Sequence, residues 1–174
     1  MSDMEFKHFK FEIKAEDDGD MTVSGYASIF GNRDRVGDVV VAGAFTKSLA
    51  SGRRVKMLWQ HDPREVIGVW DEMIEDDKGL FIQGRFANTE KGKEIRELAM
   101  MGAIDSFSIG YRTLDYEYSN SGDRLLKEVD LFEVSLVTFP ANELATITAV
   151  KTEFDEEREL LSLMLKRIEL LTAK

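Results

Sequence analysis

Two serines stand in a stretch that otherwise has the pattern of an apolar β-strand, DSFSIGY at residues 105–111. Side chains of a strand alternate between its two faces, so Ser106 and Ser108 share one face with Gly110, and the aromatic and aliphatic residues take the other. A solvated strand face is the plainer explanation, although Thr or charged residues serve that purpose better. The alternative is a nucleophile held on a rigid strand.

A serine hydroxyl becomes a nucleophile near neutral pH only beside a base, and the chain has two histidines, His8 and His61. His61 ends a predicted strand in LWQHDP and precedes a predicted turn at Asp62-Pro63, where an imidazole is accessible. A surface or capping histidine is the plainer interpretation. His8, within FKHFKF, reads as an ordinary strand residue. Asp62 is not expected to orient His61, because adjacent strand residues point apart.

The third candidate is Glu133, a carboxylate inside the apolar run LFEVSLVTF at residues 131–139. Alternation places Glu133 on one strand face with Ser135. A carboxylate is rarely buried without a partner, so it either reaches solvent at an edge, pairs with Arg or Lys, or holds an imidazole in one tautomer. A serine hydrolase is therefore one hypothesis. The spacing is not specific, since triads occur in any chain order, and there is no G-x-S-x-G motif.

Composition excludes several other classes of protein. The 174 residues suit one domain, and the net charge of −10 disfavours nucleic acid as a partner. The absence of cysteine excludes disulfides, thiolate zinc sites and cysteine nucleophiles, and two histidines cannot form a three-histidine metal site. We expect no metal and no cofactor. No apolar run is long enough for a membrane span, and the N-terminus lacks a signal region, so neither membrane insertion nor secretion is expected. A carboxylate-based glycosidase would rest on acidic abundance alone and is disfavoured.

The elements that must position these residues are mostly short strands. Period-two patterns and turn signals predict strands at 5–13, 21–30, 39–43, 55–60, 66–70, 79–86, 105–111 and 131–139. A hairpin over 113–130 is closed by SNSGD. Helices are predicted at 42–51, at 88–102 with Asn88 or Thr89 as N-cap, and at 152–171.

The expected fold is α+β or mainly β, a mostly antiparallel β-barrel or sheet packed with helices. A barrel domain over residues 1–151 is followed by a C-terminal amphipathic helix over 152–174. That helix packs either on its own domain or on another subunit or a scaffold.

Five blocks, in this order and spacing, carry a family resemblance: GYASIFGNRDRVGDVVVAGAF, MLWQHDP, VIGVW, SFSIGY and LFEVSLVTFPAN. They resemble the tailed-phage (caudoviral) prohead serine protease family, distant relatives of the herpesvirus protease assemblin. The resemblance runs from about Phe11 to Val150. It implies a β-barrel surrounded by helices, with Ser108 as nucleophile and His61 as base. Gly110, on the same strand face as Ser108, would then leave room for a substrate backbone. Glu133 is implied as the third member, with the nearby Asp130 as an alternative. Assemblin-like enzymes use a second histidine as the third member, and His8 lies outside the matching blocks, so this sequence does not obviously offer that arrangement.

The resemblance also implies a setting. Such enzymes act inside the prohead, in the host cytoplasm, where they cleave the scaffolding segment from the major capsid protein precursor, and often themselves, before DNA is packaged. The substrate partner would then be that precursor, and a homo-oligomer is left open. The competing hypothesis is a non-enzymatic capsid or tail assembly protein on a related barrel.

Overall fold

The protein is described here by a computed structural model, which covers residues 5–15, 21–34, 37–139 and 150–151. As predicted, most of the described chain is β-structure. The strands are β1 (Glu5–Ala15), β2 (Met21–Ile29), β3 (Asp38–Val40), β4 (Lys56–Trp59), β5 (Asp62–Glu75), β6 (Gly79–Phe86), β7 (Ser106–Tyr118), β8 (Arg124–Val137) and β9 (Val150–Lys151). The helices are α1 (Thr46–Ala50) and α2 (Glu90–Met100). The predicted helix at 152–171, and the domain boundary before it, lie outside the described residues.

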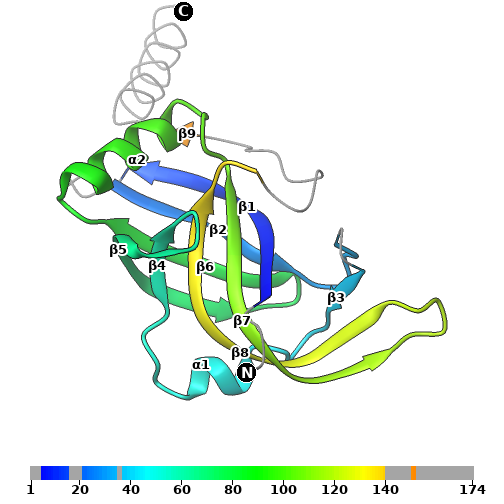
Figure 1. Ribbon diagram of the computed structural model, residues 1–174. Coiled ribbons are helices and arrows are strands. Elements are labelled where there is room, and N and C mark those ends of the chain that lie inside the picture. The colour runs from blue at the N-terminus through cyan, green and yellow to red at the C-terminus, as the bar shows by residue number, and fades with distance from the viewer. Residues whose placement is uncertain (1–4, 16–20, 35–36, 140–149, 152–174) are drawn as a thin grey trace, which may run out of the picture.

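All of these strands belong to one strongly curled sheet (Figure 1). Neighbouring strands are hydrogen-bonded in the order β2–β6–β5–β4–β8–β7–β1–β9, β3 joins β8, and β1 also pairs with β2. Most pairs are antiparallel, as predicted. Three are parallel: β4 with β8, β3 with β8, and β1 with β9. The parallel pairing of β4 with β8 is the one that builds the site.

The apolar core lies against one face of β7 and β8. Phe107, Ile109 and Tyr111 of β7 are buried there with Val134 and Leu136 of β8. This confirms the alternation predicted for the strand with the two serines. The opposite face is not solvated, however, because Ser106 and Ser108 have no exposed surface. The plainer explanation of the two hydroxyls, a solvated strand face, is therefore wrong.

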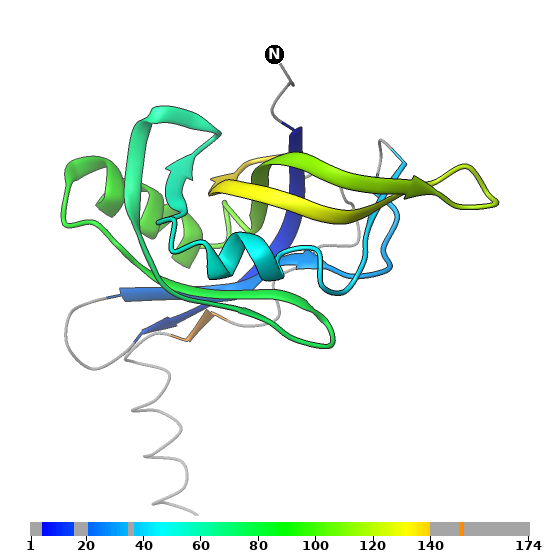
Figure 2. The ribbon, with the colours of Figure 1, turned by 90° about the horizontal axis from the view of Figure 1, so that it is seen from below.

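Strands β7 and β8 are longer than predicted and form one continuous hairpin. The strands expected at 105–111 and 131–139 merge with the hairpin expected between them, and the outer part extends away from the body of the protein (Figure 2). The predicted SNSGD turn is confirmed: the Ser119 N–H donates to the Asp123 carbonyl oxygen at 2.9 Å.

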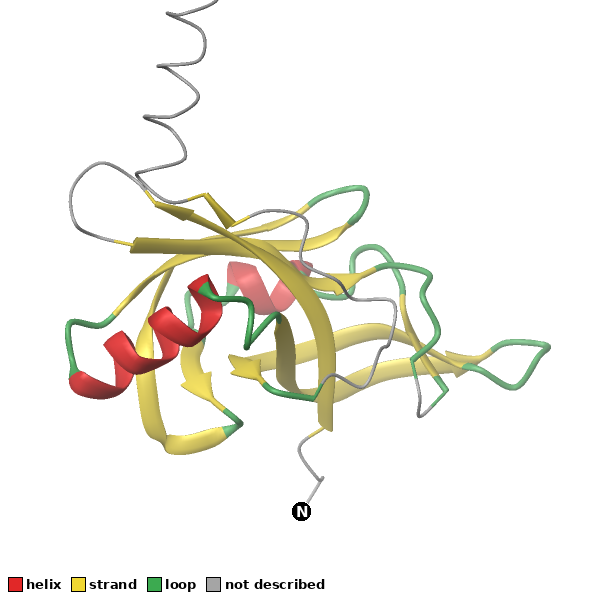
Figure 3. Ribbon diagram, turned by 90° about the horizontal axis from the view of Figure 1, so that it is seen from above, coloured by secondary structure: helices red, strands yellow, loops and turns green. Residues whose placement is uncertain are grey.

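Helix α2 has the ends that its sequence predicts. The Thr89 hydroxyl accepts the Gly92 N–H at 3.1 Å, as an N-cap does, and Gly102, with a φ of 72°, follows the last turn. Helix α1 begins later than the predicted residue 42, because Gly43 has a left-handed φ of 91°. The described helices lie against the sheet, α1 on β8 and α2 on β5 and β6, and do not surround it (Figure 3). Neither is long and apolar enough to cross a membrane.

Candidate active site

His61 lies in a tight turn between β4 and β5. Trp59 pairs with Asp62, so Gln60 and His61 alone form the loop, and their φ angles are 53° and 59°. A two-residue hairpin with positive φ at both positions is a type I′ connection, normally made by Asn or Gly. The turn predicted at Asp62-Pro63 was therefore placed two residues too late, since these residues begin β5.

Strand β8 holds this turn in place. The Gln60 N–H donates to the Leu136 carbonyl oxygen at 3.0 Å, and the His61 N–H donates to the Ser135 hydroxyl at 3.1 Å. The Gln60 side-chain amide also donates to the Thr138 hydroxyl. The left-handed conformation costs about 1 to 2 kcal/mol for each residue with a side chain, and these bonds offset part of that cost.

The imidazole of His61 is paired with the carboxylate of Glu133. His61 Nδ1 lies 2.7 Å from Glu133 Oε1, and the two side chains are 18% and 5% exposed. A histidine, and not the Arg or Lys considered from sequence, is the partner of this mid-strand carboxylate. The alternative acid, Asp130, is occupied elsewhere, since it accepts a bond from Arg53 at 2.5 Å.

Asp62 is also separate from the imidazole. Its carboxylate accepts bonds from the side chain and the backbone N–H of Arg64, and these lower the pKa of Asp62 to about 2. This agrees with the expectation that Asp62 does not orient its neighbour His61.

Ser135 forms hydrogen bonds with both members of the His61–Glu133 pair. Its hydroxyl donates to Glu133 Oε2 at 2.6 Å and accepts the His61 backbone N–H at 3.1 Å. Ser135 is fully buried. One hydroxyl therefore fixes both the carboxylate and the backbone that carries the imidazole.

Gly110 makes room for the carboxylate. It is the register partner of Glu133 across β7 and β8, and a Cβ on Gly110 would lie 2.1 Å from Glu133 Oε1. From sequence, this glycine was expected to leave room for a substrate backbone. In the structure, the space that a Cβ would need is filled by the Glu133 carboxylate.

The two serines of β7 have different neighbours in the structure. Ser108 is the register partner of Ser135, so it lies one strand spacing from the residue that links His61 to Glu133. The Ser106 hydroxyl instead donates to Asp105 at 2.8 Å, and Ser106 lies opposite Val137. On the other side of β7, the backbone of His8 in β1 is opposite Ser108.

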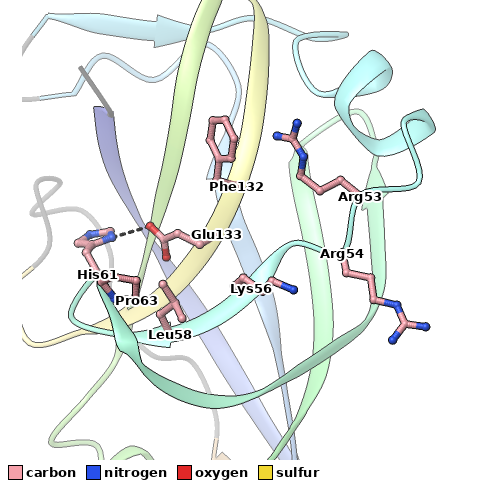
Figure 4. Close-up of a pocket in the computed structure, with 8 residues that line it drawn as sticks. All are labelled: Arg53, Arg54, Lys56, Leu58, His61, Pro63, Phe132 and Glu133. Carbon is pink, nitrogen blue, oxygen red and sulfur yellow. Dashed lines mark hydrogen bonds and ion pairs between the residues drawn. The ribbon is translucent and has the colours of Figure 1, made fainter. Parts of the chain in front are cut away.

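A pocket of about 380 Å³ opens beside the pair (Figure 4). His61 and Glu133 form one end of it. Its other lining residues are three apolar ones, Leu58, Pro63 and Phe132, and three cationic ones, Arg53, Arg54 and Lys56. Within the described parts of the chain, no group of three His, Cys, Asp or Glu residues could hold a metal ion.

The described residues thus hold a His–Glu pair next to a strand that carries a buried serine. In a comparison with known proteins, residues 9–159 match the model of the caudovirus prohead serine protease family. The chain belongs to this family. The "Prohead protease" of Enterobacteria phage HK97 is 38% identical over 148 residues, which cover 81% of this chain and 65% of that protein. The chain thus spans just under two thirds of the length of that relative.

Two other phage proteases are similar to this chain at lower sequence identity. The "Prohead protease" of Escherichia phage T5 is 32% identical over 153 residues, 83% of this chain and 72% of that protein. The structure of the bacteriophage T4 capsid assembly protease superposes with a TM-score of 0.64 at 12% identity, over 77% of this chain and 96% of that one. The structural match shows that the mostly β fold is shared.

Sequence reasoning missed the residues that position the pair. Ser135 was placed on the same strand face as Glu133 but given no role, and Gly110 was assigned a different one. The period-two pattern of β8 carries the signal for Ser135, because residues i and i+2 of a strand are neighbours on one face. No local sequence pattern predicted that three cations line one pocket, because their position next to Glu133 depends on the pairing of β4 with β8.

Proposed function

We propose that this protein is a serine endopeptidase in which Ser108 is the nucleophile, His61 the general base and Glu133 the residue that orients the base. The observation that carries the proposal is the 2.7 Å contact between His61 Nδ1 and Glu133 Oε1, on a sheet face that also holds Ser108. The family to which the chain belongs supports the reaction class.

In the proposed mechanism, Ser108 Oγ forms a bond to the carbonyl carbon of the scissile peptide while its proton passes to His61 Nε2. The tetrahedral intermediate then collapses, the C–N bond breaks, and His61 gives the proton to the leaving nitrogen. Water hydrolyses the acyl-enzyme by the same proton transfers in reverse order. The products are a new carboxylate and a new amine.

Glu133 sets the tautomer of the base. With its carboxylate at Nδ1, the neutral imidazole carries its proton there and leaves the Nε2 lone pair to accept the serine proton. Glu133 then stabilises the imidazolium that forms. Ser135 limits the rotation of the carboxylate through its bond to the second oxygen.

Access to the nucleophile is part of the proposal. The Ser108 side chain has no exposed surface in this structure. Cleavage therefore requires that the surface over Ser108 opens when a peptide binds. We expect a serine-directed fluorophosphonate to react slowly with the free protein.

For the biological setting, we propose that the substrate is the major capsid protein precursor with its scaffolding segment, that the chain also cleaves itself, and that it acts inside the prohead in the host cytoplasm. The names of the phage relatives support this assignment. We further propose that the curled sheet forms a complete barrel, which the pairing of β1 with both β7 and β2 supports.

Co-expression with the capsid precursor tests the proposal. Mass spectrometry should find discrete precursor fragments with the native chain and none with Ser108→Ala. An intact precursor with both chains, in particles that still assemble, would instead favour a non-enzymatic assembly protein.

A further inference from the structure

The pocket beside His61 and Glu133 has a chemical character of its own. Three of its lining residues are apolar, Leu58, Pro63 and Phe132, and three are cationic, Arg53, Arg54 and Lys56 (Figure 4). Three cations at one pocket stand out in a chain with 33 acidic and 23 basic residues. Such local concentrations of one sign of charge attract ligands of the opposite sign.

The charge of the pocket is not neutralised by its surroundings. Arg53 is paired with Asp130 and also lies over the Phe132 ring, with 4.5 Å to its centroid. Within the part of the chain that the structure describes, Arg54 and Lys56 have no ion pair, and both are exposed. Two cations therefore remain available to a ligand.

The carboxylate of Glu133 does not cancel this field. It is 5% exposed and already accepts hydrogen bonds from Ser135 and, at the other oxygen, contacts His61. Lys56 is its register partner on β4, so the strand position beside Glu133 carries a cation. The pocket therefore offers apolar surface and positive charge together to a ligand.

From these observations, and resting on the proposed endopeptidase function, we propose that this pocket binds an acidic side chain of the substrate, close to the scissile bond. Glutamate fits the combination best: its methylene groups contact the apolar lining residues and its carboxylate reaches Lys56 and Arg54. The pocket then selects the cleavage site, because only a peptide with an acidic residue at the matching position places its carbonyl beside Ser108.

Cleavage of a peptide library derived from a whole proteome tests this inference without knowledge of the natural substrate. Mass spectrometry of the new termini should show acidic residues enriched at one fixed position near the cut. In matched synthetic peptides, changing that Glu to Gln should lower kcat/KM about tenfold, since each partly exposed ion pair contributes a factor of up to about five. The Ser108→Ala variant measures the background cleavage that does not depend on the proposed nucleophile.

Two pocket variants give the sharper readout. Arg54→Glu and Lys56→Gln should lose the acidic preference, and Arg54→Glu should now cleave the peptide with Lys at that position better than the native chain does. Lys93→Glu is the matched control, because it makes the same charge change on an exposed residue of α2 outside the pocket and should keep the native profile.

Different results would overturn the pocket assignment and the proposed endopeptidase function. Cleavage with no acidic preference, or an unchanged preference in Arg54→Glu, would overturn the pocket assignment and leave the endopeptidase standing. If the native chain and Ser108→Ala both leave every peptide intact, the endopeptidase proposal is wrong, and the pocket assignment with it.

Discussion

His61 Nδ1 and Glu133 Oε1 lie 2.7 Å apart although 72 positions separate the residues in the chain. No local pattern relates the two. The pairing of β4 with β8 brings them together, in a parallel register that sets Leu58 beside Ser135 just before the chain turns back at His61.

Glu133→Gln should reduce kcat by roughly 10³ to 10⁴ while the fold persists, because a neutral amide no longer fixes the tautomer or stabilises the imidazolium. Asp130→Asn removes the same charge three residues away and should keep activity near the native level. Kinetics on a cleaved peptide, with a thermal melt of each variant, measure both effects. Equal losses in the two variants would contradict the role of Glu133.

Ser108→Ala should lower kcat by roughly 10⁴ to 10⁶, because the proposed nucleophile is removed. Ser106→Ala is the matched control on the same strand face, and it should lose only the bond to Asp105. Fluorophosphonate labelling followed by peptide mapping should place the adduct on Ser108. An adduct on Ser106 would move the nucleophile two residues.

Ser135→Ala should lower kcat by about 10- to 100-fold with little change in KM, since it frees one oxygen of Glu133 and leaves the His61 N–H without its acceptor. Slow labelling of Ser108 should persist, which separates a positioning residue from a nucleophile. A complete loss of labelling in a folded variant would give Ser135 a different role.

Gly110→Ala should inactivate the protein much as Glu133→Gln does, because the new Cβ would lie 2.1 Å from Glu133 Oε1 and displace the carboxylate. Gly122→Ala is a control in the distant hairpin turn, where a φ of 88° strains any side chain but no atom lies within 4 Å. It should lower the melting temperature and leave the rate unchanged. Normal kinetics in Gly110→Ala would show that the carboxylate has room to move.

The acid stability of the fold should depend on Asp62. Hydrogen bonds from Arg64 lower the pKa of this carboxyl to about 2 from an ordinary value of 3.8, so the folded chain binds fewer protons than the unfolded chain between these two values. The stabilisation is complete above about pH 4 and is lost as the pH falls toward 2. Asp62→Asn should therefore lose less melting temperature than the native chain over that interval. If both proteins lose melting temperature equally as the pH falls from about 4 to 2, the lowered pKa of Asp62 is contradicted.

Sequence reasoning was most successful where the signal is local. Alternation in SFSIGY predicted correctly which side chains face the core, and Thr89 and Gly102 bound α2 as their types indicate. In LFEVSLV alternation holds from Glu133 onward and is wrong before it: the pairing of β7 with β8 is irregular between Gly110 and Tyr111, so Leu131 joins the core and Phe132 lines the pocket with Glu133. The resemblance to prohead proteases predicted that Ser108, His61 and Glu133 form one site. The structure pairs the last two and places Ser108 one strand away.

What the sequence did not predict depends on pairing between distant strands. Gln60-His61 is an unusual pair for a type I′ turn, and bonds from β8 hold it there, so turn propensities pointed to Asp62-Pro63 instead. Ser135 is a bridge only because the β4–β5 turn lies over it. Whether Glu133 or Asp130 meets the imidazole depends on the register of β8, which no single segment encodes.

The dependence of the His61 turn on β8 sets when the protein can become active during its own synthesis. A ribosome adds about 5 to 20 residues per second, so Glu133 is made roughly 4 to 14 seconds after His61. Until β8 is complete, the two left-handed residues lack the hydrogen bonds that Leu136 and Ser135 give them, and parallel pairing of distant strands is slow in itself. On the mechanism proposed above, a nascent chain without β8 lacks the oriented base, so the order of synthesis delays cleavage until this strand has formed.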